Sequence, residues 1–375
     1  MKTITIGLLL PSSTIVPMGK DFERSLKKSL RENLGDPEIE IEVVSEFIGQ
    51  GGLVKVEEAV SKLLAYDNAD IITGIVSNKI GMEVAEKFER SKKPFLINNI
   101  GEHIPDPRSY NQYVFINSTH TWQQIWSLGY WAVKKFGSRG MFVGSVYDAG
   151  YAFTSMLKLG MEAADQECSM PFSIAPVPAG EKTADPRTVF RHIEEFKPDF
   201  ILSVFCGEEA GIFQKEYITR NYHKEIPLLA LPFLLQPFDA EGNELELYTT
   251  VASSAEVEPR EIKLTELNTA NPFSSLGSET GLILAEAINL MGSGSLLDAL
   301  KKVKVHSSRG LLHIDSSSPA KNNKVYLVRN TYSGDVSAIS MDLMEELETI
   351  DIDNKALSLW LDQPSSGWGN PYLGV

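Results

Sequence analysis

The chain has 375 residues, more than one hydrophobic core usually organises, so its length favours two domains. Hydrophobic residues make up 43% and charged residues 23% of the sequence, which is the balance of a folded protein and excludes a disordered or fibrous chain. The formal net charge is -15, so a nucleic-acid backbone or an anionic membrane surface would repel the chain. We therefore expect no nucleic-acid partner.

Cysteine and histidine usage argues against a metal or disulfide framework. Cys168 and Cys206 are too few for a disulfide scaffold, and no two of the six histidines have the spacing of metal ligands. We expect no metal and no cofactor.

The N-terminus leaves two cellular locations open. It lacks the basic region and cleavage site of a signal peptide, and no apolar run reaches the roughly 18 residues of a membrane span. The protein is cytoplasmic if Met1 is the native start. It is periplasmic, or lipid-anchored outside the cytoplasmic membrane, if a leader was removed and is absent from this sequence.

The first hundred residues alternate β-branched runs with amphipathic helical patterns, which is typical of βαβ units around a parallel sheet. The expected strands cover residues 3–11, 39–47, 70–74 and 94–98. An apolar residue at every fourth position, from Phe22 to Leu34, predicts a helix after the first strand. Further helices are expected after the second and third strands.

The alternation restarts after Thr119 and predicts a second βαβ series of similar size. A helix runs through Trp122, Trp126 and Val133, and another begins at Tyr151. The pair Asp185-Pro186 predicts a helix start, because Asp caps a helix and Pro suits its first turn. The expected strands cover residues 141–147, 172–177, 199–205 and 226–231.

The remaining residues are expected to complete these two lobes. They predict a strand at 248–254, helices at 274–290 and 296–303, and a strand pair of 311–314 with 324–328. The fold class is thus α/β, with two doubly wound βαβ lobes joined by a three-crossing hinge. Crossings are expected near residues 117–121, 253–257 and 316–323. Lobe 1 would hold residues 1–119 and 255–318, and lobe 2 residues 120–254 and 319–375.

Several segments in order carry a resemblance to a known family. The segments are residues 8–13 with Gly19, 71–78, 94–99, 115–118, 148–152, 278–290 and 309–315. Together they resemble the type I periplasmic (solute) binding proteins, in the branched-chain amino acid and amide-binding branch of ABC transporter substrate-binding proteins. The resemblance implies capture of a small polar ligand, an amino acid, amide or small carboxylate, between the lobes by hinge closure. It also implies a membrane ABC permease as partner and a monomeric protein.

Ligands of open parallel sheets lie beyond the carboxyl ends of the strands, where loops converge. The expected ligand-binding residues are Ser12, Ser13, Met18, Ser77, Asn78, Asn98, Asn99, Gly101, Glu102, Thr119, Trp122, Tyr147, Tyr151, Cys206, Glu208 and Phe233.

Ser77 and Asn78 open a helix, whose free N–H groups favour an anion such as a carboxylate. They are equally compatible with ordinary capping. Replacing Asn78 with Ala should weaken a carboxylate ligand and leave the fold intact.

Two positions depart from the family pattern. Gly101-Glu102 stands where amino acid binders often have a Thr near the ligand ammonium, and Phe233 stands near their usual acidic partner. Glu102 or Glu208 could answer a cationic group instead, while Phe233 would make the pocket more apolar.

Roles in the second lobe stay alternatives at this point. Tyr147 and Tyr151 could close over the ligand, or one of them could pack beneath a strand. Trp122 could reach the cleft, whereas Trp126 and Trp131 are expected in the core. Cys206 fits a small buried hydrophobe as well as a ligand contact.

Signatures of an enzyme are missing. The glycine-rich segment 49–55 does not have the spacing of a phosphate loop, and the sequence has no Gly-x-Ser-x-Gly. We therefore expect no catalysis. The alternative function is a ligand-sensing regulatory or receptor domain of the same fold, cytoplasmic or linked to a receptor.

Overall fold

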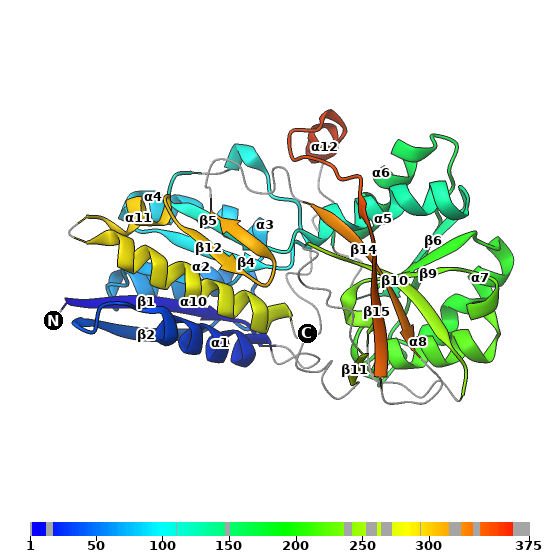
Figure 1. Ribbon diagram of the computed structural model, residues 1–375, viewed down its shortest axis with the longest axis horizontal. Coiled ribbons are helices and arrows are strands. Elements are labelled where there is room, and N and C mark those ends of the chain that lie inside the picture. Colours follow the sequence, from blue (N-terminus) through cyan, green and yellow to red (C-terminus); the bar gives the residue numbers. More distant parts are fainter. Residues whose placement is uncertain are drawn as a thin grey trace. The chain divides into compact units, whose positions relative to one another are not determined.

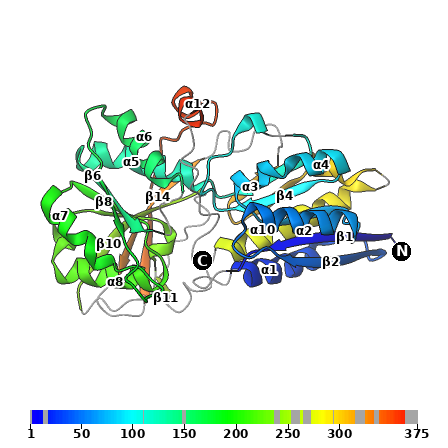
Figure 2. The same cartoon turned by 180° about the vertical axis from the view of Figure 1, so that it is seen from behind.

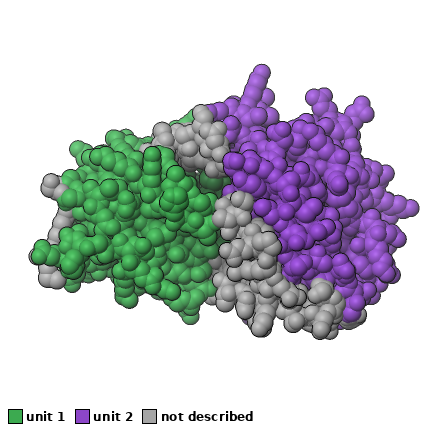
Figure 3. Space-filling view, in the orientation of Figure 1, with its two compact units in different colours: residues 1–120, 270–321, 371–375 green, residues 121–269, 322–370 purple. Residues whose placement is uncertain are grey.

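A computed structural model describes residues 2–12, 18–109, 111–146, 151–235, 242–252, 261–263, 272–292, 294–314, 324–332 and 338–362. The chain divides into two compact units (Figure 3). Unit 1 comprises residues 1–120, 270–321 and 371–375, and unit 2 comprises residues 121–269 and 322–370. The chain thus passes between the units after positions 120, 269 and 321, and again after 370. The domain boundaries expected from the sequence stay a prediction.

Unit 1 contains a parallel sheet in the order β2-β1-β3-β4-β5. Its strands are β1 (Lys2–Leu10), β2 (Ile39–Phe47), β3 (Ile71–Ile75), β4 (Phe95–Asn99) and β5 (Val114–Ser118). The three strands β3, β4 and β5 are buried at every position, as expected of central parallel strands covered on both faces. Their carboxyl ends lie at one edge of the sheet.

Helices cover both faces of this sheet (Figures 1 and 2). On one face lie α1 (Met18–Asn33) and α10 (Pro272–Met291), and on the other α2 (Leu53–Ala65), α3 (Asn78–Glu83) and α4 (Ala85–Ser91). The single helix expected after β3 is thus two short helices, which meet at Val84. The unit also contains α11 (Leu296–Leu300) and the short 3-10 turn η1 (Pro107–Ser109).

The helices α1 and α10 pack side by side although about 250 residues separate them in the sequence. A Cβ atom at Gly281 of α10 would lie 2.7 Å from the carbonyl oxygen of Leu26 in α1. Glycine therefore allows the two backbones to approach closely, and the apolar stripe of α1, including Phe22 and Leu26, is fully buried.

Unit 2 contains a mixed sheet in the order β11-β15-β14-β10-β9-β8-β6-β7. The strands β6 (Gly140–Ser145), β7 (Phe172–Ala175), β8 (Phe200–Ser203), β9 (Leu228–Ala230) and β10 (Leu245–Val251) are parallel. The strands β14 (Val325–Tyr332), β15 (Ala338–Leu347) and β11 (Glu261–Lys263) extend the sheet in antiparallel fashion. The doubly wound α/β class predicted from the sequence is confirmed.

Helices again cover both faces of the sheet in unit 2 (Figures 1 and 2). They are α5 (Thr121–Phe136) and α6 (Phe153–Ala164) on one face, and α7 (Phe190–Phe196) and α8 (Gly207–Thr219) on the other. Phe190 and Phe213 stack between α7 and α8, with ring centroids 5.4 Å apart. The expected helix start at Asp185 is confirmed as a 3-10 turn, η2 (Pro186–Val189), in which the Asp185 side chain accepts from the Arg187 N–H. Two further 3-10 turns, η3 (Tyr222–Lys224) and η4 (Pro232–Leu234), and the helix α12 (Lys355–Leu361) complete the described elements of this unit.

The expected pairing of residues 311–314 with 324–328 is wrong. The strand β13 (Gly310–His313) pairs with β12 (Lys304–Ser307) in a tight antiparallel hairpin of unit 1. The strand β14 lies in unit 2 between β10 and β15. The sequence did not predict β12, because its four residues, Lys304–Ser307, contain a single apolar side chain and so give only a weak strand pattern.

Candidate functional site

Polar side chains gather at the carboxyl ends of β3, β4 and β5 in unit 1. The Ser77 hydroxyl caps α3 by accepting from the Ile80 N–H at 3.3 Å, and this hydroxyl is fully buried. The capping alternative for Ser77 is therefore present in the structure. Capping leaves other N–H groups of the first turn without a helical partner, which is the physical basis for anion binding there.

Asn98 joins four elements through one buried side chain. Its Nδ2 donates to Thr73 Oγ1 at 3.0 Å and to the Gly74 carbonyl at 3.2 Å in β3. Its Oδ1 accepts from Thr280 Oγ1 of α10 at 2.6 Å and from Asn117 Nδ2 of β5 at 3.2 Å. This amide therefore fixes the mutual placement of β3, β4, β5 and α10.

Asn99 and Asn78 hold the loop that follows β4. Asn99 Nδ2 donates to Asn78 Oδ1 at 2.8 Å, and Asn99 Oδ1 accepts from the Gly101 N–H at 3.0 Å. Asn78 Nδ2 donates to the His103 carbonyl at 2.8 Å. Gly101 has φ of +78°, which is why glycine suits this turn. Because Asn78 is 1% exposed and bonded on both sides, replacing it with Ala should also disturb this loop.

Glu102 lies within that loop and is buried without a partner. It is 1% exposed, and neither carboxyl oxygen makes a hydrogen bond of normal geometry. Burial raises the pKa of this carboxyl to about 8, although the N–H groups of residues 100–102 partly oppose the shift. The group is therefore mostly neutral at pH 7.

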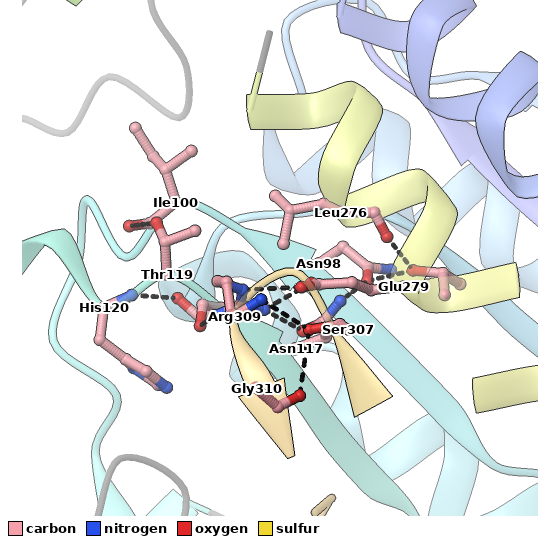
Figure 4. Close-up of polar contacts among 12 residues, drawn as sticks. Asn98, Ile100, Asn117, Thr119, His120, Leu276, Glu279, Ser307, Arg309 and Gly310 are labelled. Atoms are coloured by element: carbon pink, nitrogen blue, oxygen red, sulfur yellow. Dashed lines mark hydrogen bonds and ion pairs between the residues drawn. The ribbon is translucent and has the colours of Figure 1, made fainter. Parts of the chain in front are cut away.

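A buried ion pair that the sequence reading missed lies beside this edge (Figure 4). Arg309, in the turn of the β12–β13 hairpin, contacts Glu279 of α10 through two hydrogen bonds of 2.8 and 2.5 Å. The two side chains are 9% and 3% exposed. The apolar sequence of α10 contains only two acids, Glu279 and Glu286, and this was the available signal, since a carboxylate that becomes buried requires a partner.

Arg309 also holds the segment after β5. It donates to the Ser118 carbonyl and to Asn117 Oδ1, each at 2.7 Å. The neighbouring Thr119 hydroxyl donates to the Ile100 carbonyl at 2.8 Å (Figure 4). His120 has φ of +51°, and burial together with the nearby Arg309 charge lowers its pKa to about 3. The end of β5 is thus held from two sides, and His120 is neutral at physiological pH.

The remaining residues predicted in the first lobe lie apart from this cluster or outside the residues that the structure describes. Ser12 is exposed, and its N–H and hydroxyl both donate to the Gly49 carbonyl. Met18 begins α1 and is buried. Ser13 and, in the second lobe, Tyr147 lie outside the described residues.

Apart from Trp122, the described residues among those predicted in the second lobe follow the carboxyl ends of strands in unit 2. Tyr151, 5% exposed, lies between β6 and α6 and packs against Phe153. Cys206 precedes α8 and is buried, whereas Glu208 in the first turn is exposed. Phe233 lies in η4. Trp122 is fully buried in α5.

Glu209, next to the predicted ligand residue Glu208, is buried in α8. Its Oε1 accepts from the Ala184 N–H at 2.6 Å, and burial raises its pKa. Helical periodicity could have indicated that Glu209 is buried and Glu208 exposed, since adjacent residues of a helix point in different directions.

The structure therefore brings one group of predicted residues together at the unit 1 edge. They are Ser77, Asn78, Asn98, Asn99, Gly101, Glu102 and Thr119. Their roles toward a ligand stay predictions. Among the described residues no cluster of potential metal ligands occurs, and no helix is long and apolar enough to cross a membrane.

Comparisons with known proteins place this fold in a family. No curated protein matches the chain by sequence. A family model described as "Periplasmic binding protein" matches residues 3–330.

Solved structures share the fold at low sequence identity. An ABC transporter substrate-binding protein from Sphaerobacter thermophilus is 20% identical, with a TM-score of 0.73 over 93% of this chain and 99% of that one. A solute-binding protein from R. palustris in complex with 4-hydroxybenzoate is 16% identical, with a TM-score of 0.68 over 93% and 98%. A branched-chain amino acid transporter substrate-binding protein from Streptococcus pneumoniae, in complex with isoleucine, is 16% identical, with a TM-score of 0.62 over 92% and 100%.

The family model covers most of the chain, and the two α/β units have the architecture of type I members. Members bind solutes and are not enzymes, in agreement with the function class expected from the sequence. The chain belongs to the periplasmic binding protein family.

Proposed function

We propose that the chain captures a small solute bearing a carboxylate and delivers it to an ABC permease. The observation that carries this proposal is the gathering of buried polar groups at the carboxyl ends of β3, β4 and β5. Ser77, Asn99 and Thr119 represent the three strand ends. Loops at this edge of a parallel sheet are where ligands of such folds bind.

The donors available at this edge are mostly neutral. The Asn99 amide and the Thr119 hydroxyl already donate within the protein, so the donors offered to a carboxylate are chiefly the backbone N–H groups that begin α3. Similar structures were solved with 4-hydroxybenzoate, benzoate or isoleucine. These ligands differ in size and charge but share a carboxylate, which supports this ligand class for the present chain.

The manner of capture is part of the proposal. Contacts from residues of the second lobe, including Tyr151, Cys206, Glu208 and Phe233, would favour a closed form by their differential affinity for it. We further propose that the protein acts as a monomer. Membership of the family implies an extracytoplasmic location, as in ABC importers.

A thermal-shift panel tests the ligand class. Benzoate, 4-hydroxybenzoate and isoleucine are compared with benzamide and isoleucinamide, which lack the carboxylate. A ligand present at a hundred times its dissociation constant should stabilise the folded protein by roughly 2.7 kcal/mol. Stabilisation by a carboxylate but not by its amide supports the proposal. Equal stabilisation by both, or by none of them, contradicts it.

A further inference from the structure

Glu102 is fixed in position by its neighbours in the loop rather than by its own side chain. The preceding Gly101 donates its N–H to Asn99, and the following His103 accepts from Asn78 through its carbonyl. Asn78 and Asn99 also bond each other. The loop is therefore anchored immediately before and immediately after Glu102, at the ends of β3 and β4.

The carboxyl group of Glu102 has no ion-pair partner and no hydrogen bond of normal geometry among the described residues. The N–H groups of residues 100–102 partly oppose the rise in its pKa, and the side chain is 1% exposed. A buried, unpaired carboxyl group costs free energy, so an anchored loop that carries one is unexpected on stability grounds alone. By contrast, both carboxyl oxygens of Glu279 accept hydrogen bonds from Arg309.

Charged groups on the surrounding segments do not compensate Glu102. The titratable side chains on these described segments are Lys79 in α3, His103 in the same loop, His120 after β5, and Arg309 in the β12–β13 turn, which bonds the end of β5. None of them contributes to the pKa of Glu102, whose causes are burial and backbone N–H groups alone. The environment therefore favours the neutral acid, which offers one O–H donor.

We propose that Glu102 remains protonated and donates a hydrogen bond from its carboxyl group to the carboxylate of the bound solute. The proton stays on Glu102 throughout. The site would then prefer a carboxylate without an adjacent ammonium group, because an ammonium would favour the charged form of Glu102. This inference rests on the proposed function and adds the charge state of the site and the ligand subclass.

Isothermal titration with benzoate at about pH 7 and at about pH 9.5 tests the proposal, since this range lies above the ordinary titration of histidine and below that of lysine. With a Glu102 pKa of about 8, only the protonated fraction binds. The affinity should then fall about 30-fold between the two pH values. Isoleucine at the same protein concentration should bind more weakly than benzoate at pH 7.

Two variants separate Glu102 from other titrating groups. Glu102→Gln keeps a neutral donor but cannot ionise, so its affinity for benzoate should not change with pH. Glu102→Leu loses the donor and should bind benzoate at least about 10-fold more weakly at pH 7. This variant should still fold, because an apolar side chain is favoured at a position that is 1% exposed. Glu83→Gln is the matched control, because Glu83 is an exposed carboxylate at the end of α3 and should retain the wild-type pH dependence.

The outcomes distinguish this inference from the proposed function. Benzoate binding that is independent of pH in the wild type, or equally pH-dependent in E102Q, overturns the role of Glu102 and leaves carboxylate capture standing. Tighter binding at high pH, with isoleucine preferred, would show charged Glu102 answering an ammonium and also overturn the inference. No binding of any carboxylate at either pH overturns the proposed function and this inference with it.

Discussion

Two buried glutamates of unit 1 differ in how the protein accommodates them. Glu279 is paired with Arg309, whose guanidinium donates two hydrogen bonds to it. Glu102 has no counter-charge and no hydrogen bond of normal geometry, and burial raises its pKa to about 8, so it is mostly neutral at pH 7. A buried carboxyl group can thus be accommodated either by an ion pair or as the neutral acid.

Glu102 should make the protein less stable as the pH rises. Its pKa is about 8 in the folded chain and near its ordinary value of 4.5 in the unfolded chain, so the folded state holds a proton that the unfolded state has lost between these values. The contribution to stability is fully present below the unfolded pKa and is lost as the pH rises toward the folded pKa, at up to about 1.4 kcal/mol per pH unit. Urea unfolding of wild type and Glu102→Gln from about pH 5 to about pH 8 measures this slope.

The free energy of unfolding of the E102Q variant should increase relative to that of the wild type as the pH rises from about 5 to about 8. Glu83→Gln serves as the control, because an exposed carboxyl should leave the slope unchanged. A constant difference between wild type and E102Q would mean that Glu102 is ionised in the folded protein.

Replacing Arg309 with Ala should destabilise unit 1 by about 3–5 kcal/mol, because it leaves a buried Glu279 carboxylate without its partner. The double variant Arg309→Met with Glu279→Met removes both charges and should recover most of the loss. Chemical unfolding of the single and double variants provides the measurement. If the double variant is as unstable as Arg309→Ala, the bonds to Asn117 and Ser118 contribute more than the ion pair.

At the scale of elements, the close approach of α1 and α10 depends on glycine. Gly281→Ala would place a Cβ atom 2.7 Å from the Leu26 carbonyl oxygen, and moving the helices apart should cost about 1–3 kcal/mol. Gly211→Ala is the matched control in α8, since no atom lies within 4 Å of the added Cβ. It should instead stabilise by up to about 1 kcal/mol through helix propensity. Thermal unfolding of both variants checks the contrast, and equal effects would contradict it.

At the same scale, local patterns predicted most helices and strands but not all of their partners. The four-residue repeat from Phe22 to Leu34 indicated α1, and Asp185-Pro186 indicated the start of η2. The predicted pairing of β13 with residues 324–328 was wrong, because strand pairing depends on which segments meet in space. The true partner, β12, has only a weak strand pattern in the sequence.

At the scale of the whole molecule, each unit is assembled from separate stretches of the chain. Unit 1 takes α10 and the β12–β13 hairpin from beyond residue 270, and unit 2 takes β14 and β15 from beyond residue 322. The contacts that complete each core are therefore long in sequence separation. The chain therefore crosses between the units at several positions, which is consistent with a solute-binding protein of this family.

The sequence by itself determined the α/β class, the two-lobe organisation and the family, because hydrophobic periodicity and the order of short motifs are local properties of the chain. It also indicated the strand ends where Asn78, Asn99 and Glu102 meet, since parallel strands present their carboxyl ends at one edge. Only the tertiary structure decided that Arg309 neutralises Glu279 while Glu102 is left buried and unpaired. The reason is physical: burial and charge pairing depend on neighbours contributed by distant segments, and these set the charge state of a carboxyl group.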